Sequence, residues 1–599
     1  MGFLARIGSE SAYFSGALRA LSKVTRIAKN PGRTFPQVAE SLAEIHGDRI
    51  ALISDRERMT YRQYNDRANQ YARWALDQGL SKGDTVALMM PNRPEYLAVW
   101  LGIARAGGVT ALLNTNLTGP ALAHCVNIVK AKHVIVDAVL VDAFGTAEPH
   151  LDPRPALWCH GGAPDGYSRL DTRLDALSSS AIPASDLPGL TTDDKCLFIY
   201  TSGTTGLPKA ANINHYRVQS IMFGFNAAMS MTAKDRVYVC LPMYHTSGGV
   251  IAAGAALTAG GSVVIREKFS SSMFWDDIVR HDCTVFQYIG ELCRYLLNSP
   301  THPQETRHRI RLACGNGLRP DIWEDFQRRF RIPKILEWYA ATEGNAVFFN
   351  FDGKVGAVGR IPKWLEWKFV TDVVRFDIDS EEPVRGADGF CIRCQPGEVG
   401  EVISQILNDP KKPSQRFEGY ADAAATQKKI LRDVFEKGDR WFRTGDLMRK
   451  DQLGYFYFVD RIGDTFRWKG ENVATSEVSE ALTAFPGIKE ANVYGVGVPA
   501  SEGKAGMAAL VVEDELDLEG FSRHVIRQLP AYARPVFLRI QRQIEATSTF
   551  KQRKLDLAKQ GFDPNSIADP LYFLHPESQV YVGLGAADFS AICGGKVRL

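Results

Sequence analysis

The sequence predicts an α/β protein: a large N-terminal domain of layered α/β subdomains with a β-rich part, then a small, mobile C-terminal α+β domain. Its 599 residues exceed what one hydrophobic core normally holds. Apolar strands alternate with helical segments from about residue 50 to 140 and again up to about 370, a pattern typical of largely parallel sheets. After Asp460 the pattern changes to a compact unit.

The elements follow from apolar runs and their spacing. The sequence predicts strands at 84–90, 133–137, 196–200 and 491–498, helices at 95–106 and 477–484, and a β-richer stretch to about 460. Residues 145–193, rich in Pro, Asp, Ser and Gly, are predicted to be a surface connection. The uncharged stretch 246–265 nominally reaches membrane-spanning length. Gly260 and Gly261 divide it, which favours a buried helix and strand.

Residues 1–34 are predicted to form an amphipathic N-terminal segment. One acid, Glu10, stands among the basic residues Arg6, Arg19, Lys23, Arg26 and Lys29. Apolar residues recur at roughly helical spacing: Leu4, Ile7, Phe14, Leu18, Leu21 and Ile27. Such a helix lies on an anionic membrane surface or packs on its own domain, and the sequence favours neither.

Composition narrows the class of protein. Hydrophobic residues make up 45% and charged residues 23%, as in ordinary globular proteins. A net charge of +3 without a long basic block argues against nucleic-acid binding. The ten scattered cysteines fit a reducing compartment. Cys391 and Cys394 have the spacing of metal ligands, but no second pair lies nearby, which favours two apolar strand residues over a zinc site.

The loop after the strand at 196–200 has an unusual composition. It combines glycines, hydroxyl side chains and one cation: Thr201, Ser202, Gly203, Thr204, Thr205, Gly206 and Lys209. Successive backbone N–H groups in a Gly-rich turn bind anions, and hydroxyl groups and a lysine add donors and charge. The spacing of a Walker P-loop is absent. The loop therefore predicts a polyphosphate site of another kind.

Four further motifs follow in order: WYAATEGN (338–345), WFRTGDL (441–447), FVDRIGDTFRWKGENV (458–473) and STFKQRK (548–554). With the loop, they resemble the adenylate-forming superfamily of acyl-CoA synthetases, luciferases and peptide-synthetase adenylation domains. DRIGDTFRWKGENV, GNGLRPDIW and DPLYFL resemble the fatty-acid transport protein / very-long-chain acyl-CoA synthetase family. The resemblance covers roughly residues 35–575, and residues beyond 575 match no pattern that we can interpret.

The resemblance implies a reaction in two steps and a role for each matching residue. A carboxylate and ATP give an acyl-adenylate and pyrophosphate, and the thiol of coenzyme A then displaces AMP. The β- and γ-phosphates would be held by Thr201 to Lys209. Adenine would be bound by Gly315, Asn316 and Gly317, with Tyr339 packed on the base. The ribose would be bound by Asp446 and Arg461. Thr342 would contact the α-phosphate, Glu343 would help to hold Mg²⁺, and Lys551 would bridge carboxylate and phosphate oxygens. His245 would lie near the carboxylate, with a core histidine as the alternative.

The resemblance also implies domain boundaries and a moving part. It predicts an ATP- and acyl-binding domain at 35–462 and a small domain with the catalytic lysine at 463–599. Rotation of the small domain would separate the two steps. The hinge falls at Gly463 or Asp464, and the sequence does not choose between them.

The favoured function is a long- or very-long-chain fatty acid–CoA ligase. It would be cytoplasmic, peripheral on the cytoplasmic face of a membrane through the N-terminal segment, and able to form a homodimer. Uptake of fatty acid would follow from trapping it as its CoA ester. One alternative is a ligase for bile acids or other bulky carboxylates. A stand-alone fatty-acid transporter is disfavoured by the lack of a convincing span, and a peptide-synthetase module by the lack of a carrier domain.

Overall fold

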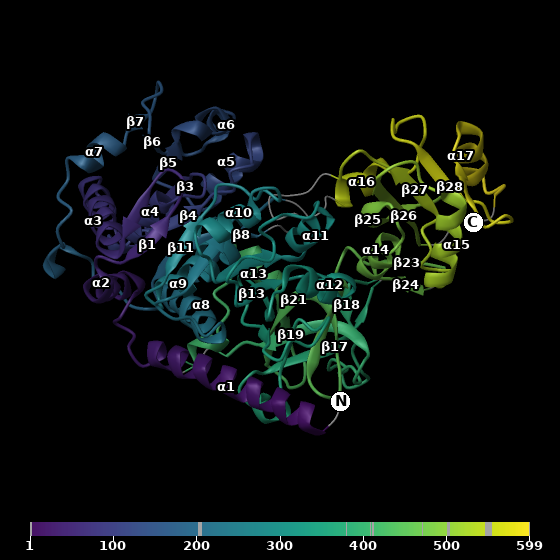
Figure 1. Ribbon diagram of the computed structural model, residues 1–599, viewed down its shortest axis with the longest axis horizontal. Helices are drawn as coiled ribbons and strands as arrows, with labels where there is room; N and C mark the ends of the chain where they lie inside the picture. The colour runs from purple at the N-terminus through teal and green to yellow at the C-terminus, as the bar shows by residue number, and fades with distance from the viewer. Residues whose placement is uncertain are drawn as a thin grey trace.

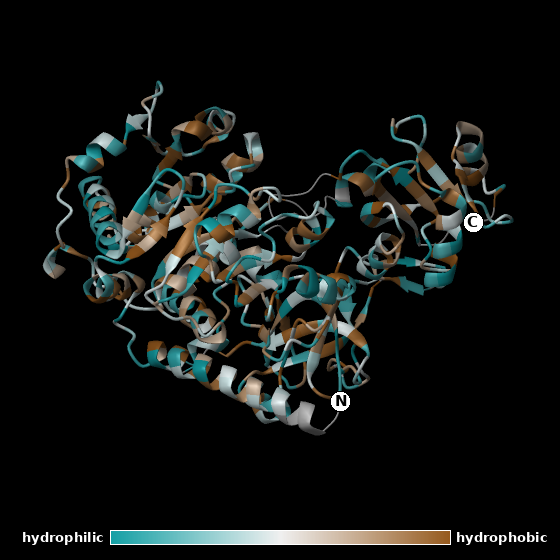
Figure 2. Cartoon of the chain, viewed as in Figure 1, coloured by the Kyte–Doolittle hydropathy of each residue, from teal (hydrophilic) through white to brown (hydrophobic). Residues whose placement is uncertain are grey.

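The computed structural model describes residues 3–201, 207–378, 380–407, 409, 412–469, 471–499, 503–544, 554–597 and 599. It confirms the predicted fold class. A large part is built mainly on two sheets, and a smaller C-terminal part is built on a third sheet (Figure 1). The hydrophobic residues concentrate in the strands and on the helix faces that cover them (Figure 2).

The first sheet has the strand order β7-β6-β5-β3-β4-β8-β9, and only β8 and β9 pair antiparallel. Every residue of the parallel strands β3, β4 and β5 is buried, as expected for a sheet with both faces covered. Its strands are β3 (Thr85–Met89), β4 (Val109–Leu112), β5 (His133–Asp137), β6 (Ala156–His160), β7 (Ser168–Arg169), β8 (Lys195–Thr201) and β9 (Lys209–Asn214). Its helices include α3 (Tyr61–Asp77), α4 (Pro94–Arg105) and α5 (Gly119–Ile128).

The prediction that residues 145–193 are only a surface connection is wrong in part. Strand β6 lies within them, and four of its five residues are buried beside β5. The run is short and stands between Pro155 and Gly161, so the turn-forming residues around it obscured the strand.

The second sheet joins a parallel half to an antiparallel half. The parallel strands are β1 (Ile50–Ile53), β10 (Arg236–Val239), β11 (Ser262–Ile265), β12 (Val285–Ile289), β13 (Leu312–Asn316) and β14 (Ile335–Ala340). The antiparallel strands include β15 (Val347–Asn350), β16 (Gly359–Arg360), β17 (Thr371–Asp377), β19 (Val399–Gln405), β21 (Arg440–Lys450) and β22 (Tyr455–Arg461). The predicted β-rich stretch corresponds to this second half.

The small part has its own hydrophobic core. Its sheet runs β25-β26-β27-β28-β29, with strands β25 (Ile488–Gly497), β26 (Lys504–Val512), β27 (Phe537–Ile540), β28 (Leu571–Leu574) and β29 (Tyr581–Gly583). Its helices are α14 (Thr475–Thr483), α15 (Leu518–Gln528), α16 (Lys554–Gln560) and α17 (Ala586–Cys593). Residues beyond 575, which matched no pattern, therefore add an edge strand and a helix to this core.

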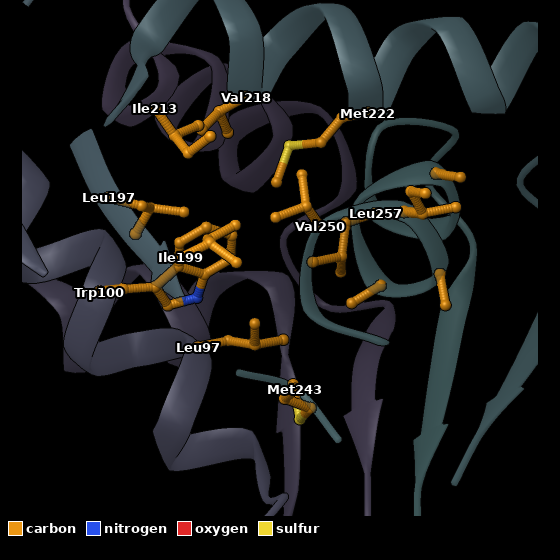
Figure 3. Packing of buried hydrophobic residues seen from close by; sticks show 14 of the residues in the cluster. Leu97, Trp100, Leu197, Ile199, Ile213, Val218, Met222, Met243, Val250 and Leu257 are labelled. Carbon is orange, nitrogen blue, oxygen red and sulfur yellow. The ribbon is translucent and has the colours of Figure 1, made fainter. Parts of the chain in front are cut away.

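The stretch 246–265 is mostly buried, as predicted, but its first helix is a π-helix. It forms η4 (Thr246–Ala253), α9 (Gly254–Leu257) and β11. Val250 and Leu257 pack toward Met222 of α8 (His215–Ala228) in the core shown in Figure 3. A Cβ at Gly254 would lie 2.2 Å from Met222 Cγ, so glycine permits this close approach. Among the described residues, none of the helices combines the length and the apolar character that a membrane crossing requires.

The N-terminal segment packs on its own domain, one of its two predicted placements. It forms α1 (Phe3–Ala28), which runs along the large part and contacts α8 (Figure 1). The Tyr13 hydroxyl donates to the Arg360 carbonyl, and the Lys23 Nζ donates to Asn226 Oδ1 at 2.5 Å. Ile27 faces inward, whereas Phe14 and Leu18 face solvent, so the predicted apolar stripe is divided between two surroundings.

Candidate active site

One cavity of about 1790 Å³ brings together most of the predicted site residues. Ten of them line it: Thr201, Lys209, His245, Asn316, Gly317, Tyr339, Thr342, Glu343, Asp446 and Arg461. Gly315 lies behind the wall, where a Cβ would be 2.3 Å from the Tyr288 carbonyl oxygen. Ser202, Gly203, Thr204, Thr205, Gly206 and Lys551 lie outside the described residues. The cavity exceeds the usual size of a ligand pocket, about 300–1,000 Å³.

The two ends of the predicted phosphate loop are fixed by a hairpin. Thr201, which ends β8, pairs with Lys209, which begins β9. The Lys209 Nζ lies 5.9 Å from the centre of the Tyr420 ring. Burial and the nearby charges of Lys429 and Lys428 lower the pKa of Lys209. Both of these lysines line the cavity, although sequence reasoning did not single them out. Three close cations repel one another, and a bound polyanion would relieve that repulsion.

A cationic side chain supports the segment that carries Thr342 and Glu343. Arg217, on α8, donates to the carbonyl oxygens of Ala341 and Thr342, each at 2.9 Å, and also to that of Gly344. Burial lowers the pKa of Arg217. The three carbonyl groups converge on one planar guanidinium, which fixes the turn after β14.

This turn presents a hydroxyl and a carboxylate to the cavity. The Thr342 Oγ1 lies 3.2 Å from the Thr246 Oγ1 at the start of η4. The buried Glu343 accepts a hydrogen bond of 2.6 Å from the Tyr420 hydroxyl. One carboxylate beside hydroxyl groups suits Mg²⁺, which takes most of its other ligands from substrate phosphates and water. Glu343 is therefore the described side chain that could hold this ion next to a polyphosphate.

A buried carboxyl group holds the predicted adenine turn. Glu337, on β14 and only 1% exposed, accepts hydrogen bonds from the backbone N–H of Gly317 and, at 3.1 Å, of Leu318, and from the Tyr288 hydroxyl. Burial raises its pKa to about 8. Gly317 has φ of 81°, which favours glycine. Sequence reasoning missed Glu337, although an acid within the apolar strand 335–340 was an available signal.

The same turn offers an acceptor to a ligand. Asn316 lines the cavity, and its buried Oδ1 has no hydrogen-bond partner among the described residues. An unsatisfied buried acceptor is costly, so a ligand with an N–H donor would gain from binding here. The exocyclic amine of adenine is such a donor.

Tyr339 of β14 lies together with Asp446 of β21 and Arg461 of β22, although β15 and β16 separate β14 from β22 in the sheet. The Tyr339 hydroxyl donates to Asp446 Oδ2 at 2.5 Å, and its ring stacks on Phe348. Asp446 pairs with Arg461 across the two strands, and the Arg461 Nε lies 3.8 Å from Asp446 Oδ1. Burial raises the pKa of Tyr339 strongly, so its hydroxyl keeps its proton. A carboxylate has about four lone-pair sites, so Asp446 can contact Tyr339 and Arg461 and still accept hydrogen bonds from vicinal hydroxyl groups.

The far end of the cavity is apolar. Aromatic rings follow one another along its wall from Trp338, next to Tyr339, to α1: Trp338–Phe225 at 4.9 Å, Phe225–Phe349 at 5.1 Å, Phe349–Phe351 at 5.3 Å and Phe351–Tyr13 at 5.1 Å between ring centres. We call this series the aromatic ladder. Small and aliphatic residues complete the wall: Ala17, Ala20, Leu21 and Val24 of α1, Ile221 and Gly224 of α8, and Leu365. We call the space around the ladder the apolar chamber.

His245 lines the same cavity. It precedes η4, and its ring centre is 4.6 Å from that of Tyr244. The Tyr244 hydroxyl accepts a hydrogen bond of 3.2 Å from Asn116 Nδ2. Since His245 lines the cavity, its predicted place beside a substrate carboxylate stays a prediction that this position permits.

Comparison with known proteins agrees with this geometry. Residues 39–404 match the model of the AMP-binding enzyme family, and residues 477–551 match that of the AMP-binding enzyme C-terminal domain. Long-chain fatty acid transport protein 1 of Mus musculus is 42% identical over 577 residues, which cover 95% of this chain and 89% of the relative.

Solved structures share the fold. ATP-bound MatB from Rhodopseudomonas palustris has a TM-score of 0.72 at 24% identity, and a Mycobacterium tuberculosis fatty acyl CoA synthetase has one of 0.61 at 24% identity. Each match covers 88% of this chain and 98% of the other. The predicted family is confirmed. The chain therefore belongs to the AMP-binding enzyme family, in the group of the long-chain fatty acid transport proteins.

Proposed function

We propose that the protein activates long- or very-long-chain fatty acids to their CoA esters through an acyl-adenylate, with release of pyrophosphate and AMP. One observation carries the proposal: residues suited to a nucleotide and the apolar chamber line the same cavity. A fatty acid is an anion joined to an apolar chain, and this cavity offers cations at one end and aromatic rings at the other. Each buried methylene contributes about 0.8 kcal/mol to binding.

In the first step, a carboxylate oxygen attacks the α-phosphorus of ATP, and the bond to pyrophosphate breaks. Two anions must approach each other, so the barrier depends on positioning and on charge stabilisation. Lys209 and its neighbours Lys428 and Lys429 would hold the phosphates, and Thr342 would contact the α-phosphate. Mg²⁺ held by Glu343 would neutralise part of the phosphate charge. Lys551 would bridge the two reacting groups, as the resemblance implies.

In the second step, the thiolate sulfur of coenzyme A attacks the acyl carbonyl carbon, and AMP leaves. Lys551 must give way to the thiol, so the small part would rotate about the segment after Arg461. Gly463 has φ of 91° in this structure, which supports it over Asp464 as the hinge. The predicted domain boundary at 462/463 lies at the same place.

The similarity to long-chain fatty acid transport proteins supports a fatty-acid substrate. The alternative of a bile acid or another bulky carboxylate needs a wider chamber than a single alkyl chain requires. We further propose that the protein works at the cytoplasmic face of a membrane and that uptake follows from trapping the acid as its CoA ester.

The test is ATP-dependent pyrophosphate release with a panel of fatty, aromatic and steroid acids, followed by CoA ester formation. The expected result is turnover that rises with alkyl chain length. A preference for steroid or aromatic acids would show that the proposed substrate is wrong. Fatty-acid flux without thioester formation would show that the protein is a transporter and not a ligase.

A further inference from the structure

We propose that one exposed surface of this protein docks on a phospholipid bilayer and thereby places the apolar chamber at the membrane surface. The surface consists of Phe14 and Leu18 of α1 and of Trp364 and Trp367, in and beside η5 (Lys363–Leu365), and we call it the outer patch. The link to the chamber rests on the proposed function, whereas docking itself does not.

The outer patch is both apolar and exposed. Phe14 is 56% exposed, Leu18 57%, Trp364 42% and Trp367 77%. The four side chains form one group. The Phe14 and Trp364 ring centres are 5.6 Å apart, and Leu18 follows Phe14 by about one helical turn. Trp367 is hydrogen-bonded to the Trp364 carbonyl group. Single exposed apolar residues are common, but a contiguous group of large ones marks an interaction site.

The structure holds these rings in place. The Trp364 Nε1 donates to Glu10 Oε2 at 3.2 Å, and the Trp367 Nε1 donates to the Trp364 carbonyl oxygen at 3.0 Å. Since the polar edge of each indole is already bonded within the protein, the ring surface that remains is apolar. Tryptophan is enriched at membrane–water interfaces, where one part of the ring meets hydrocarbon and another stays hydrated.

The charge around the outer patch favours an anionic lipid surface. Arg19 and Arg26 of α1, Lys29 directly after it and Lys363 of η5 are exposed. Of the acids on these segments, Glu10 is paired with Arg360 and Glu366 with Lys450 at 2.8 Å. Basic residues beside exposed aromatic rings are the combination that binds anionic headgroups and the acyl boundary together. This combination favours a bilayer over a protein partner.

The other face of α1 lines the cavity. Tyr13, Ala17, Leu21 and Val24 border the apolar chamber, and Leu365 borders it directly beside Trp364. One helix thus separates the outer patch from the chamber. An alkyl chain that left a bilayer beneath the patch would need to pass only α1 to reach the aromatic ladder. This arrangement would spare the chain a passage through water.

The experiment measures binding of the full chain to sedimenting vesicles of phosphatidylcholine alone and of phosphatidylcholine with phosphatidylserine. The test variant combines Leu18→Ser with Trp367→Ser, neither of which lines the cavity. The control is Ile45→Ser on α2 (Phe35–His46), where the side chain is 71% exposed. Thermal unfolding checks that all three proteins are folded.

We expect the double variant to bind the anionic vesicles at least about tenfold more weakly and the control to bind like the wild type. Thioester formation from a water-soluble short-chain acid should be unchanged, and that from a long-chain acid supplied in vesicles should fall. Unchanged vesicle binding, an equal loss in the control, or a change only in self-association measured by sedimentation velocity would overturn the proposal. If the wild type activates no acid, but the double variant still binds vesicles more weakly than the wild type, the proposed function is refuted and docking is supported.

Discussion

The Asp460 carboxylate accepts two hydrogen bonds from Thr475, one of 2.6 Å from its backbone N–H and one of 2.8 Å from its hydroxyl. The two residues lie on opposite sides of Gly463 in the chain. Burial raises the pKa of Asp460. The pair ties α14 of the small part to β22 of the large part, so any rotation about Gly463 must break these two bonds.

Gly463→Pro should therefore change the two half-reactions unequally. Proline fixes φ near −65° and cannot adopt the value of 91° found here. The half-reaction that needs this arrangement should slow at least about tenfold, a barrier change of roughly 1.4 kcal/mol. The measurement compares pyrophosphate release with thioester formation from supplied acyl-adenylate, and Asp464→Pro is the matched variant. Equal loss in both half-reactions would indicate a folding defect.

Lys551→Ala should abolish acyl-adenylate formation yet still convert supplied acyl-adenylate and CoA to thioester. Lys554→Ala is the control three residues along the chain. Its Nζ donates to the Thr475 hydroxyl and lies 3.4 Å from Asp464 Oδ2, so it braces the small part near the proposed hinge. The control should not lose adenylation selectively, and the assigned role of Lys551 fails if both variants behave alike.

Glu343→Gln should raise the Mg²⁺ concentration required for half-maximal activity by at least about tenfold, because an amide does not supply the charge of a carboxylate ligand. Tyr420→Phe removes the hydrogen bond that orients Glu343 but keeps the charge. Its effect on the Mg²⁺ requirement should be smaller. A Mg²⁺ titration of pyrophosphate release measures both, and an unchanged requirement in Glu343→Gln would remove this residue from the metal site.

Glu337 should make the stability of the protein fall as the pH rises. Its pKa is about 8 in the folded protein against an ordinary value of 4.5, because burial favours the neutral form. Its contribution is full below pH 4.5 and is lost progressively as the pH approaches 8. Glu337→Gln keeps acceptors for the Gly317 and Leu318 N–H groups but does not titrate. The free energy of unfolding of this variant should vary less over that range than that of the wild type, and parallel curves would contradict the assignment.

Gly224→Leu should shorten the preferred acyl chain. Among the described residues, a Cβ at this position would meet only Val24 Cγ2, at 3.8 Å, so the new side chain would extend into the chamber between α8 and α1. Each methylene that loses its place costs about 0.8 kcal/mol, or roughly fourfold in kcat/KM. Turnover is measured across a series of straight-chain acids, with the shortest acid as internal control. A uniform loss across the series would mean that the chamber does not hold the chain.

Much of the fold was predictable because strong local signals coincide with buried elements. The strand at 133–137 was predicted with the bounds that the structure gives, since five residues in a row are buried. The motifs around Thr342 and Asp446 are continuous in the sequence, so their place in one site followed from the resemblance. The π-helix η4 is only eight residues long, which is too short for apolar spacing to distinguish it from an α-helix.

Other features depend on contacts between distant residues. Glu337 holds the Gly317 turn from the neighbouring strand, and Lys429 approaches Lys209 from the β-rich half of the chain. No local pattern encodes either distance. The same holds for α1, whose sequence is compatible with packing on a membrane surface or on a protein surface. Its inner residues line a cavity that forms only when the large part is folded. The roles of Lys551 and of Ser202 to Gly206 stay predictions.

The position of α1 also sets the order in which the protein can be completed. This helix is synthesised well before the residues that it packs on, because Ser9 is hydrogen-bonded to Asp352 and to Tyr455, 343 and 446 positions later. During synthesis, the apolar side chains of α1 therefore stay uncovered until these later segments have been made. Until then, those side chains are exposed to aggregation, and a chaperone or a lipid surface would protect them. The position of α1 therefore matters for folding during synthesis as well as for catalysis.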